Sequence, residues 1–315
     1  MSPPTKYRET PDRRAEFALC IVVLIWGLNI PTVKYALGFV DALFFNALRL
    51  IISAVCLGIV DRIEARRESN RPEIPWFAVV RIGLVGSLFY QVAFIKGIHY
   101  TTAGNTALLL ASIPVWTGIV AFLMNEERLA WREWCGLICA FLGTSVVTFD
   151  GSANFSQSHM RGNLLILTAS ILWAVGTILT RRAMTGISPN RLAFLMTIVM
   201  LPFHLAIGLP GTSAADLEAT GVLFWAAVFF SGALSTGLGY SLWNFGVKRI
   251  GSSHAAVFQN MAPVIALTAS WLMLAEPIRS SQILGGVMIL GGLFVMRASR
   301  RNSARSPIPA TKPTA

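Results

Sequence analysis

Charged residues are scarce in this sequence. Asp, Glu, Lys and Arg make up 13% of its 315 residues, whereas a soluble globular protein carries roughly 25%. Hydrophobic residues reach 54%, and the mean hydropathy is +0.61. Because charged side chains are what hold a folded surface in water, this deficit argues against an ordinary soluble protein. The composition favours a protein that is solvated by lipid.

Cysteine is also rare, and motifs for catalysis or nucleotide binding are missing. The four cysteines all lie in apolar runs. Cys135 and Cys139 have no His or carboxylate at metal-ligand spacing, so we interpret the cysteines as buried small apolar residues. Neither a phosphate-binding G-x-x-x-x-G-K-[ST] loop nor a G-x-S-x-G nucleophile motif occurs. We therefore expect no metal, no cofactor, no ATP drive within this chain and no enzymatic activity.

Long polar stretches are missing as well. A helix needs about 20 mainly apolar residues to cross about 30 Å of hydrocarbon, and ten such runs follow one another with short connections. Because backbone polar groups cannot stay unpaired in lipid, each run is predicted to be a helix. Their approximate limits are 17–36, 42–60, 77–97, 103–124, 131–149, 162–181, 191–209, 222–245, 253–274 and 280–297.

The basic residues indicate how these helices are oriented. Of the 26 Lys and Arg residues, Arg49 lies inside a run, four fall on the predicted outer side (Lys34, Lys96, Arg161 and Arg279), and the rest fall on the inner side. The cytoplasmic excess of Lys and Arg places both termini inside. The net charge of +11 therefore orients the protein and predicts no nucleic-acid partner. We expect a multi-pass protein of the bacterial inner membrane.

The two halves of the sequence resemble each other. A shift of 147 residues aligns Trp26 with Trp173, and a shift of 149 aligns several further residues. These further pairs are Pro114 with Pro263, Glu127 with Glu276, Gly136 with Gly285, and Gly143 with Gly292. Each copy holds five runs, an odd number, so the second copy enters the membrane from the opposite side. Inverted repeats of this kind are common in secondary transporters.

The predicted fold is therefore an all-α integral membrane protein of ten transmembrane helices in two inverted five-helix repeats. The first repeat covers 17–149 and the second covers 162–297. A cytoplasmic segment, 1–16, precedes them, and an external loop, 150–161, joins them. A disordered cytoplasmic tail, 298–315, follows.

Four segments resemble a known family. They read IWGLNIPTVK (25–34), SIPVWTGIVAFLMNEERL (112–129), LWAVGTILTRR (172–182) and MAPVIALTASWLMLAEPI (261–278). With the Gly-rich helix that closes each half, they are similar to the EamA family of the drug/metabolite transporter superfamily. The resemblance implies the ten-helix fold and export of amino acids, other metabolites or drugs. It also implies that Glu127 and Glu276 belong to the framework, where they fix helix ends or loops, or act as gates.

Arg49 is the outstanding candidate for a functional residue. It lies about nine residues into the second run, and an Arg at a helix centre costs about 2.5–3.5 kcal/mol on insertion scales. It should therefore face a cavity or a partner. One interpretation is an anchor for a substrate carboxylate or phosphate, held by the bidentate guanidinium. The other is a structural Arg that bonds backbone carbonyls at a helix break or reaches toward headgroups.

Aromatic and amide side chains recur at comparable depth in both halves and suit an amphipathic or zwitterionic solute. The alternative is that the Trp and Tyr residues form the interfacial aromatic belt. Buried amides need partners, so the amide side chains should face other helices or a cavity. The candidate cavity residues besides Arg49 are Trp26, Asn29, Tyr90, Gln91, Trp173, Tyr240, Trp243, Asn244, Gln259 and Asn260.

Three further side chains and four glycines complete the prediction. Pro114 and Pro263 remove backbone hydrogen bonds mid-run, and they predict matching hinges near a central site or passive kinks. His204, just after a proline, is either a proton-titrating group or a neutral hydrogen-bonded side chain. The matching Gly pairs in the fifth and tenth runs, two turns apart in each, predict close helix packing and, less directly, a dimer face.

We therefore expect a secondary transporter that exports a small metabolite, such as an amino acid or a related compound, by alternating access. The alternative is a membrane-embedded lipid-handling or receptor protein without a transport cycle. The expected partners are a small-molecule substrate and the lipid bilayer, with the protein as a monomer or a homodimer.

The orientation can be tested by cysteine labelling in intact cells. A cysteine at position 157 is expected to react with a membrane-impermeant maleimide only from outside, and one at position 68 only from inside. Reaction of both positions from the same side would contradict the inverted topology.

Overall fold

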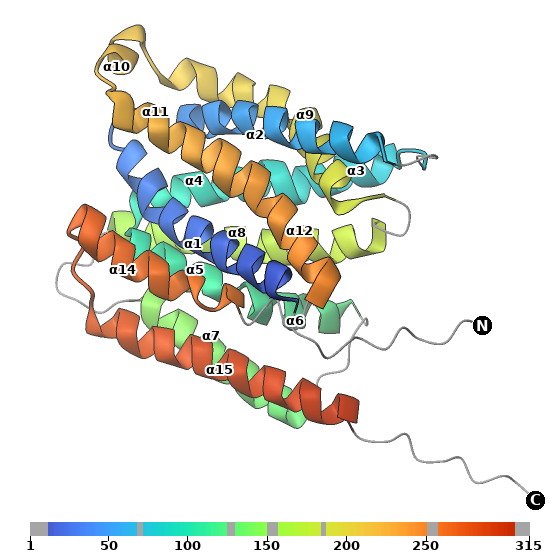
Figure 1. Cartoon of the computed structure of the whole chain (residues 1–315). Coiled ribbons are helices and arrows are strands. Elements are labelled where there is room, and N and C mark those ends of the chain that lie inside the picture. Colours follow the sequence, from blue (N-terminus) through green and yellow to red (C-terminus); the bar gives the residue numbers. More distant parts are fainter. Residues whose placement is uncertain are drawn as a thin grey trace, which may run out of the picture.

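A computed structural model describes residues 12–67, 72–124, 130–149, 157–183, 187–250 and 258–305. These residues form helices joined by short connections, and no strand occurs among them. Figure 1 shows the long helices side by side along one common direction. The first described helix begins, and the last ends, at the same end of this bundle. We call this end the terminal end and the opposite one the distal end.

The helices follow the predicted order. In the first half they are α1 (Arg13–Ala36), α2 (Ala42–Ala65), α3 (Trp76–Gly83), the π-helical η1 (Leu84–Phe89), α4 (Tyr90–Tyr100), α5 (Ala103–Ala111), α6 (Ile113–Leu123) and α7 (Trp131–Thr148). In the second half they are α8 (Gln157–Ala183), α9 (Pro189–Gly208), the short η2 (Leu209–Gly211), α10 (Ala214–Glu218), α11 (Val222–Phe229), the π-helical η3 (Phe230–Leu238), α12 (Gly239–Ile250), α14 (Ala262–Leu274) and α15 (Ser280–Arg305).

Seven helical stretches, some of them built from two or three consecutive helical segments, are long and apolar enough to cross a membrane. They correspond to the predicted runs one to four and six to eight. Two shorter apolar helices, Ala262–Leu274 and Ser280–Met296, correspond to runs nine and ten. Run five is α7, whose first turn holds the charged pair Arg132 and Glu133. Residues 253–257, where run nine was predicted to start, lie outside the described residues.

Helix ends differ from the predicted boundaries by several residues. The Asp12 carboxylate accepts hydrogen bonds from the backbone N–H of Arg14 and Ala15, so α1 begins one turn earlier than predicted. α8 begins at Gln157, inside the predicted external loop. α15 continues to Arg305, so residues 298–305 extend the last helix instead of opening the predicted disordered tail. Basic residues are favourable near a helix C-terminus, which helps to explain this extension.

Three pairs of corresponding helices in the two halves start at the same spacing. α4 and α12, α6 and α14, and α7 and α15 each begin 149 residues apart. The two π-helical segments, η1 and η3, also occupy corresponding places directly before α4 and α12. The structural repeat therefore follows the offset seen in the sequence.

Helices α7 and α15 pack backbone against backbone through their glycines. A Cβ atom on Gly136 would lie 2.5 Å from the carbonyl oxygen of Gly292, and one on Gly143 would lie 2.7 Å from that of Gly285. Such distances exclude any side chain, as predicted for these four residues. Residue numbers rise along α7 as they fall along α15, so these two corresponding helices run antiparallel.

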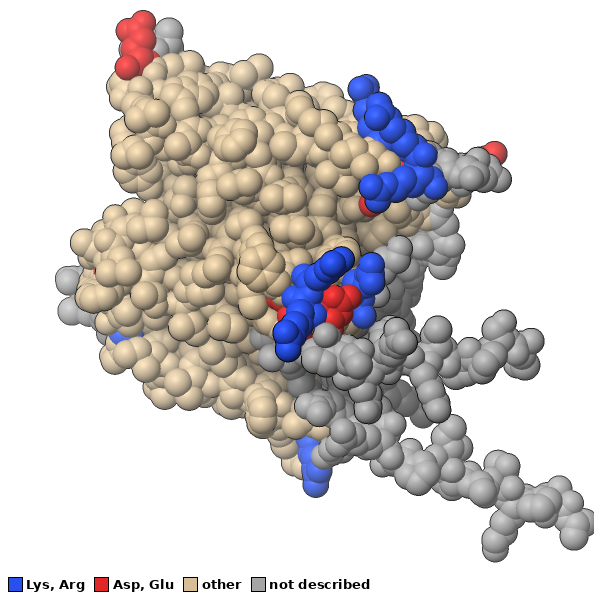
Figure 2. All heavy atoms as spheres, in the orientation of Figure 1, with Lys and Arg blue, Asp and Glu red and all other residues tan. Residues whose placement is uncertain are grey.

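The flank of the bundle is almost free of charge. Figure 2 shows Lys and Arg gathered mainly at the terminal end, with a broad uncharged surface between the two ends. Large apolar side chains such as Phe77 and Phe294 are mostly exposed on it, as expected for a surface that faces lipid. Cys20 and Cys135 are exposed as well, so the prediction that the cysteines are buried is wrong for these two. A thiol is apolar enough to face lipid.

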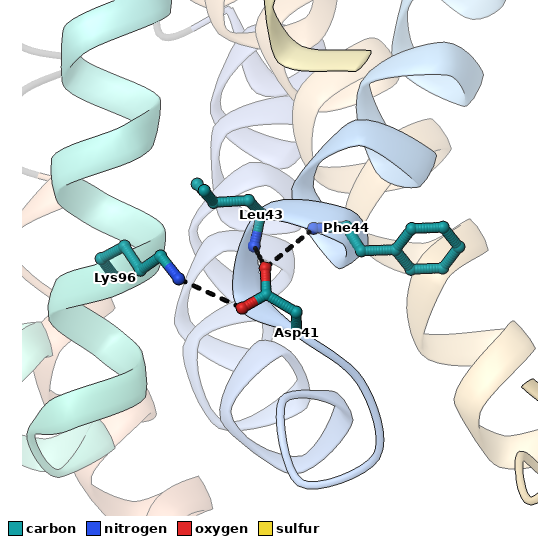
Figure 3. A network of polar contacts seen from close by, with 4 residues as sticks. All are labelled: Asp41, Leu43, Phe44 and Lys96. Atoms are coloured by element: carbon teal, nitrogen blue, oxygen red, sulfur yellow. Dashed lines mark hydrogen bonds and ion pairs between the residues drawn. The ribbon is translucent and has the colours of Figure 1, made fainter. Parts of the chain in front are cut away.

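Polar contacts tie the helices together at the distal end. The Asp41 carboxylate accepts hydrogen bonds from the backbone N–H of Leu43 at 2.7 Å and of Phe44 at 3.4 Å, and it pairs with the Lys96 ammonium at 3.1 Å (Figure 3). Burial raises the pKa of the Asp41 carboxyl. The backbone hydrogen bonds and Lys96 outweigh burial and hold that pKa below its usual range. Asp41 thus caps α2 and links it to α4.

The glycine contact can be tested with neighbouring residues of one helix. Gly292→Ala places a methyl group 2.7 Å from the backbone nitrogen of Ala140, and overpacking of this kind costs about 1–3 kcal/mol. We expect a lower melting temperature in detergent by several degrees. Gly291→Ala is the matched control, because nothing lies within 4 Å of its added Cβ. Equal melting temperatures for the two variants would contradict the close packing.

The Asp41 contact predicts a pH dependence of stability. Because folding lowers the pKa of this carboxyl, its contribution is present above the unfolded pKa of about 3.9 and is lost as the pH falls through the folded value. Asp41→Asn keeps the helix cap but removes the charge. We expect it to be less stable than the wild type at pH 7, by about 0.5–1 kcal/mol. The difference should shrink as the pH falls below about 3.9, and a difference that does not shrink on acidification would exclude the charge as its cause.

Candidate functional site

Five aromatic side chains from four helices form a continuous cluster, which we call the aromatic cluster. Trp26 of α1 lies 6.1 Å from Tyr240 and 5.4 Å from Trp243, both of α12, between ring centroids. Tyr240 lies 5.9 Å from Trp173 of α8, which in turn lies 4.8 Å from Tyr90 of α4. All five side chains keep part of their surface accessible. The cluster joins the two halves of the chain.

The π-helical segments position two members of this cluster. Tyr90 is the first residue after η1, and Tyr240 is the second residue after η3. An inserted π turn rotates the residues that follow it around the helix axis, and such turns are frequent at functional sites. Trp26 is held by its indole N–H, which donates to the Ser235 carbonyl of η3 at 3.1 Å. A Cβ atom on Gly239 would lie 2.9 Å from the Trp26 ring nitrogen, so only glycine allows this contact.

Arg49 of α2 lies next to the aromatic cluster and is 3% exposed. Its Nε donates to Asn46 Oδ1 at 3.0 Å, its Nη1 donates to Ser231 Oγ at 3.1 Å, and its Nη2 donates to Gln91 Oε1. We call Asn46, Ser231 and Gln91 the neutral cradle. The cradle collects acceptors from α2, η3 and α4.

The guanidinium has no carboxylate partner among the described residues. The ionisable groups that interact with it are Tyr90, Tyr240 and His204, and its carbon lies 5.5 Å from the centroid of the Phe94 ring. The ring face of Phe94 is favourable for the cation. Neutral hydrogen bonds and aromatic rings therefore replace a counter-ion, which leaves a buried positive charge beside the aromatic cluster.

His204 of α9 is linked to Arg49 through Asn46. Asn46 Nδ2 lies 3.3 Å from His204 Nδ1. Because Asn46 Oδ1 is used by Arg49, its amide nitrogen is the donor, and His204 Nδ1 accepts in the neutral Nε2–H form. His204 is 1% exposed, and its Nε2 has no hydrogen-bond partner among the described residues. The geometry fits a neutral histidine that orients Asn46.

The other predicted cavity residues lie around this centre. Asn29, nearly one turn beyond Trp26, is buried, and its Oδ1 has no partner among the described residues. Asn244, one turn beyond Tyr240, donates to Asn190 Oδ1 at 2.9 Å and so contributes to a helix contact. Gln259 and Asn260 are half-buried, Gln259 at the end of a helical segment and Asn260 in the turn that precedes α14.

Pro114 and Pro263 each open a helix instead of bending one. Both lie in the first turn, of α6 and α14 respectively, where a missing N–H costs little. Run four is interrupted at Ser112, whose hydroxyl donates to the Leu109 carbonyl at 2.5 Å. Ser170 of α8 donates to the same carbonyl at 3.2 Å, so the break is satisfied by side chains.

Glu276 binds the start of a helix in the other half. Its two carboxylate oxygens accept the backbone N–H of Ala103 at 3.1 Å and of Gly104 at 3.2 Å. Lys34 donates to the carbonyls of Ile98, His99 and Thr101 at the end of α4. At the distal end Glu276 thus links the two halves, whereas Lys34 links α1 to α4 within the first half. Glu127, the counterpart of Glu276, lies outside the described residues.

Sequence reasoning missed Asn46, Ser231 and Phe94. Asn46 precedes Arg49 by three residues and so shares its helix face, which was a usable signal. Ser231 is 182 residues away from Arg49, and no local pattern indicates that contact. No group of three or more His, Cys, Asp or Glu side chains that could hold a metal occurs in the described part of the chain.

The sequence pattern of the EamA-like transporter family matches this chain twice, over residues 13–149 and 160–298. The chain belongs to the EamA-like transporter family. The double match confirms both the predicted family and the internal repeat. The family description and the names of the relatives point to a transporter and not to an enzyme.

Relatives extend over nearly the whole chain. An uncharacterized transporter of Bacillus subtilis is 27% identical over 87% of this chain and 93% of its own length. A probable amino-acid metabolite efflux pump of Salmonella typhimurium is 28% identical over 90% and 95%. A probable terminal-alkyne amino-acid exporter of Streptantibioticus cattleyicolor is 24% identical over 93% and 98%.

A solved crystal structure of a protein shares the fold of this EamA-like chain. It superimposes with a TM-score of 0.63 at 19% identity and covers 93% of this chain and 99% of its own. At this identity the likeness concerns the fold alone.

Proposed function

We propose that this EamA-like protein is a secondary transporter that exports a small amphipathic metabolite, an amino acid or a related compound, by alternating access. The observation that carries the proposal is Arg49, a buried cation with neutral partners, beside an aromatic cluster to which both halves contribute. An anionic group on an apolar body would match both features. The names of two relatives, an efflux pump and an exporter of amino-acid compounds, support the direction and the substrate class.

The topology we propose has ten spans in two oppositely inserted five-helix units. The antiparallel course of the corresponding helices α7 and α15 supports inversion. The gathering of Lys and Arg at the terminal end (Figure 2) supports a cytoplasmic location for that end and for both termini. The proposed location is the bacterial inner membrane, with the protein as a monomer or a homodimer and no nucleic-acid partner.

Alternating access requires that contacts between the halves break at one end while the other end closes. At the distal end these contacts include Glu276 with the start of α5. At the other end of α2, Glu64 accepts from Ser188 at 2.9 Å and from Asn190 at 2.6 Å. In the proposed cycle the helix breaks before Pro114 and Pro263 act as hinges between these two groups of contacts.

The proposal is tested by flux in proteoliposomes loaded with a panel of labelled amino acids and N-acyl amino acids. We expect wild-type protein to move at least one of them. Arg49→Ala should reduce that flux about 10–100-fold, because a hydrogen bond to a charged group contributes about 1.5–3 kcal/mol. Arg49→Lys keeps the positive charge but loses the bidentate guanidinium, so it should retain intermediate flux.

Arg81→Ala is the matched control. Arg81 is exposed on α3, so its loss removes the same charge without touching the site. Monodisperse elution in detergent establishes that each variant is folded. Wild-type flux in folded Arg49→Ala would remove Arg49 from the site. Lipid movement without solute flux would favour a lipid-handling protein instead.

A further inference from the structure

The described carboxylates of this chain all lie away from the centre of the bundle. Each falls in a connection, in the short helix α10, or within two turns of a helix end. They are Asp12, Glu16, Asp41, Asp61, Glu64, Glu73, Glu133, Asp216, Glu218 and Glu276. None of them interacts electrostatically with Arg49. The positive charge beside the aromatic cluster is therefore not balanced by the described part of the protein.

The neutral cradle fixes the guanidinium without neutralising it. Asn46 and Ser231 are fully buried, and with Gln91 they accept one hydrogen bond each from Nε, Nη1 and Nη2. A guanidinium has more N–H donors than these three bonds use. The donors that remain are of the kind that binds a carboxylate or phosphate.

Arg49 and two of its three cradle residues, Asn46 and Gln91, belong to the first half of the chain, whereas Ser231 comes from the second half. At the shift of 147 residues, the counterparts of Asn46 and Arg49 in α9 are Ala193 and Met196. The counterpart of Gln91 at the shift of 149 is Tyr240. The fold has a repeat, but the charged group has no copy. Its retention in one half is therefore not a requirement of the repeated architecture.

We propose, resting on the function proposed above, that the site selects its substrate by a carboxylate group and that a substrate ammonium group is dispensable. The carboxylate binds the unused N–H donors of Arg49, and the apolar body packs against the aromatic cluster. The ammonium of a free amino acid finds no carboxylate in the described residues, and Arg49 repels it. The preferred substrate class is thus an organic monocarboxylate with an apolar body, and N-acyl amino acids fit it at least as well as free amino acids.

The charge preference is tested with three compounds that share one side chain. N-acetylphenylalanine is an anion, phenylalanine a zwitterion and phenylalanine amide a cation at neutral pH. Flux of each is measured in proteoliposomes that hold the wild-type protein, and the series is repeated with the derivatives of leucine, alanine and tryptophan. We expect the N-acetyl compound to move at least as fast as the free amino acid, and the amide about tenfold or more slowly.

The outcomes separate the two proposals. Faster movement of the amide than of the N-acetyl compound would overturn carboxylate selection and leave transport intact. The same holds if phenylalanine moves and its N-acetyl derivative does not. Absence of flux for every compound, with folded protein in the membrane, would overturn the transport function and the inference together.

A charge placed in the cradle gives an independent test. Gln91→Glu puts a carboxylate at the acceptor of Nη2 with almost no change of shape, so Arg49 gains an internal counter-ion. We expect the flux of the N-acetyl compound to fall about tenfold or more, so that the amide no longer moves more slowly than the N-acetyl compound. Gln91→Met removes the same acceptor without adding charge. It should lower the flux of all three compounds and keep their order, whereas an unchanged order in Gln91→Glu would overturn the proposal.

Discussion

Arg49 carries a permanent charge at a place where the surrounding helices leave little solvent to stabilise it, and the polar contacts around it follow from that placement. The guanidinium is stabilised by hydrogen bonds and by an aromatic ring instead of by water. These come from the neutral cradle, the Phe94 ring and the pair of Asn46 with His204. All of these groups except the half-buried Gln91 are buried. Removing any one of the polar groups therefore leaves an unpaired polar atom, and removing the Phe94 ring leaves a less stable cation.

The aromatic cluster depends on a different constraint, the geometry of the helices that carry it. π-helical segments precede Tyr90 and Tyr240, and glycine at 239 makes room for Trp26. The glycine pairs of α7 and α15 join the ends of the two halves outside this region. π-helical turns thus adjoin the candidate site, while the close backbone contact between α7 and α15 lies away from it.

Hydropathy and the internal repeat were sufficient to predict the helical membrane fold, the order of its elements and the close packing of the glycine helices. The cost of burying a guanidinium was sufficient to single out Arg49. The sequence could not indicate which side chains accept from it, because Ser231 is distant along the chain and becomes a neighbour only through packing of η3 on α2. Nor do the apolar residues of η1 and η3 signal a change of helical period. The sequence likewise could not indicate that Asn244 donates a hydrogen bond to Asn190, because tertiary packing decides which side chains meet.

Arg49 has no charged counterpart in the second half of the chain, and this asymmetry has a consequence for transport kinetics. If Arg49 holds the ligand, the anchor stays with the first half of the chain whichever face is open, and only the opposing wall changes. Ligand therefore meets two different surroundings at the two faces, in spite of the symmetric backbone. An equilibrium carrier of this design has unequal half-saturation concentrations on its two sides, while the gradient of the carried compound still sets the net direction of flow.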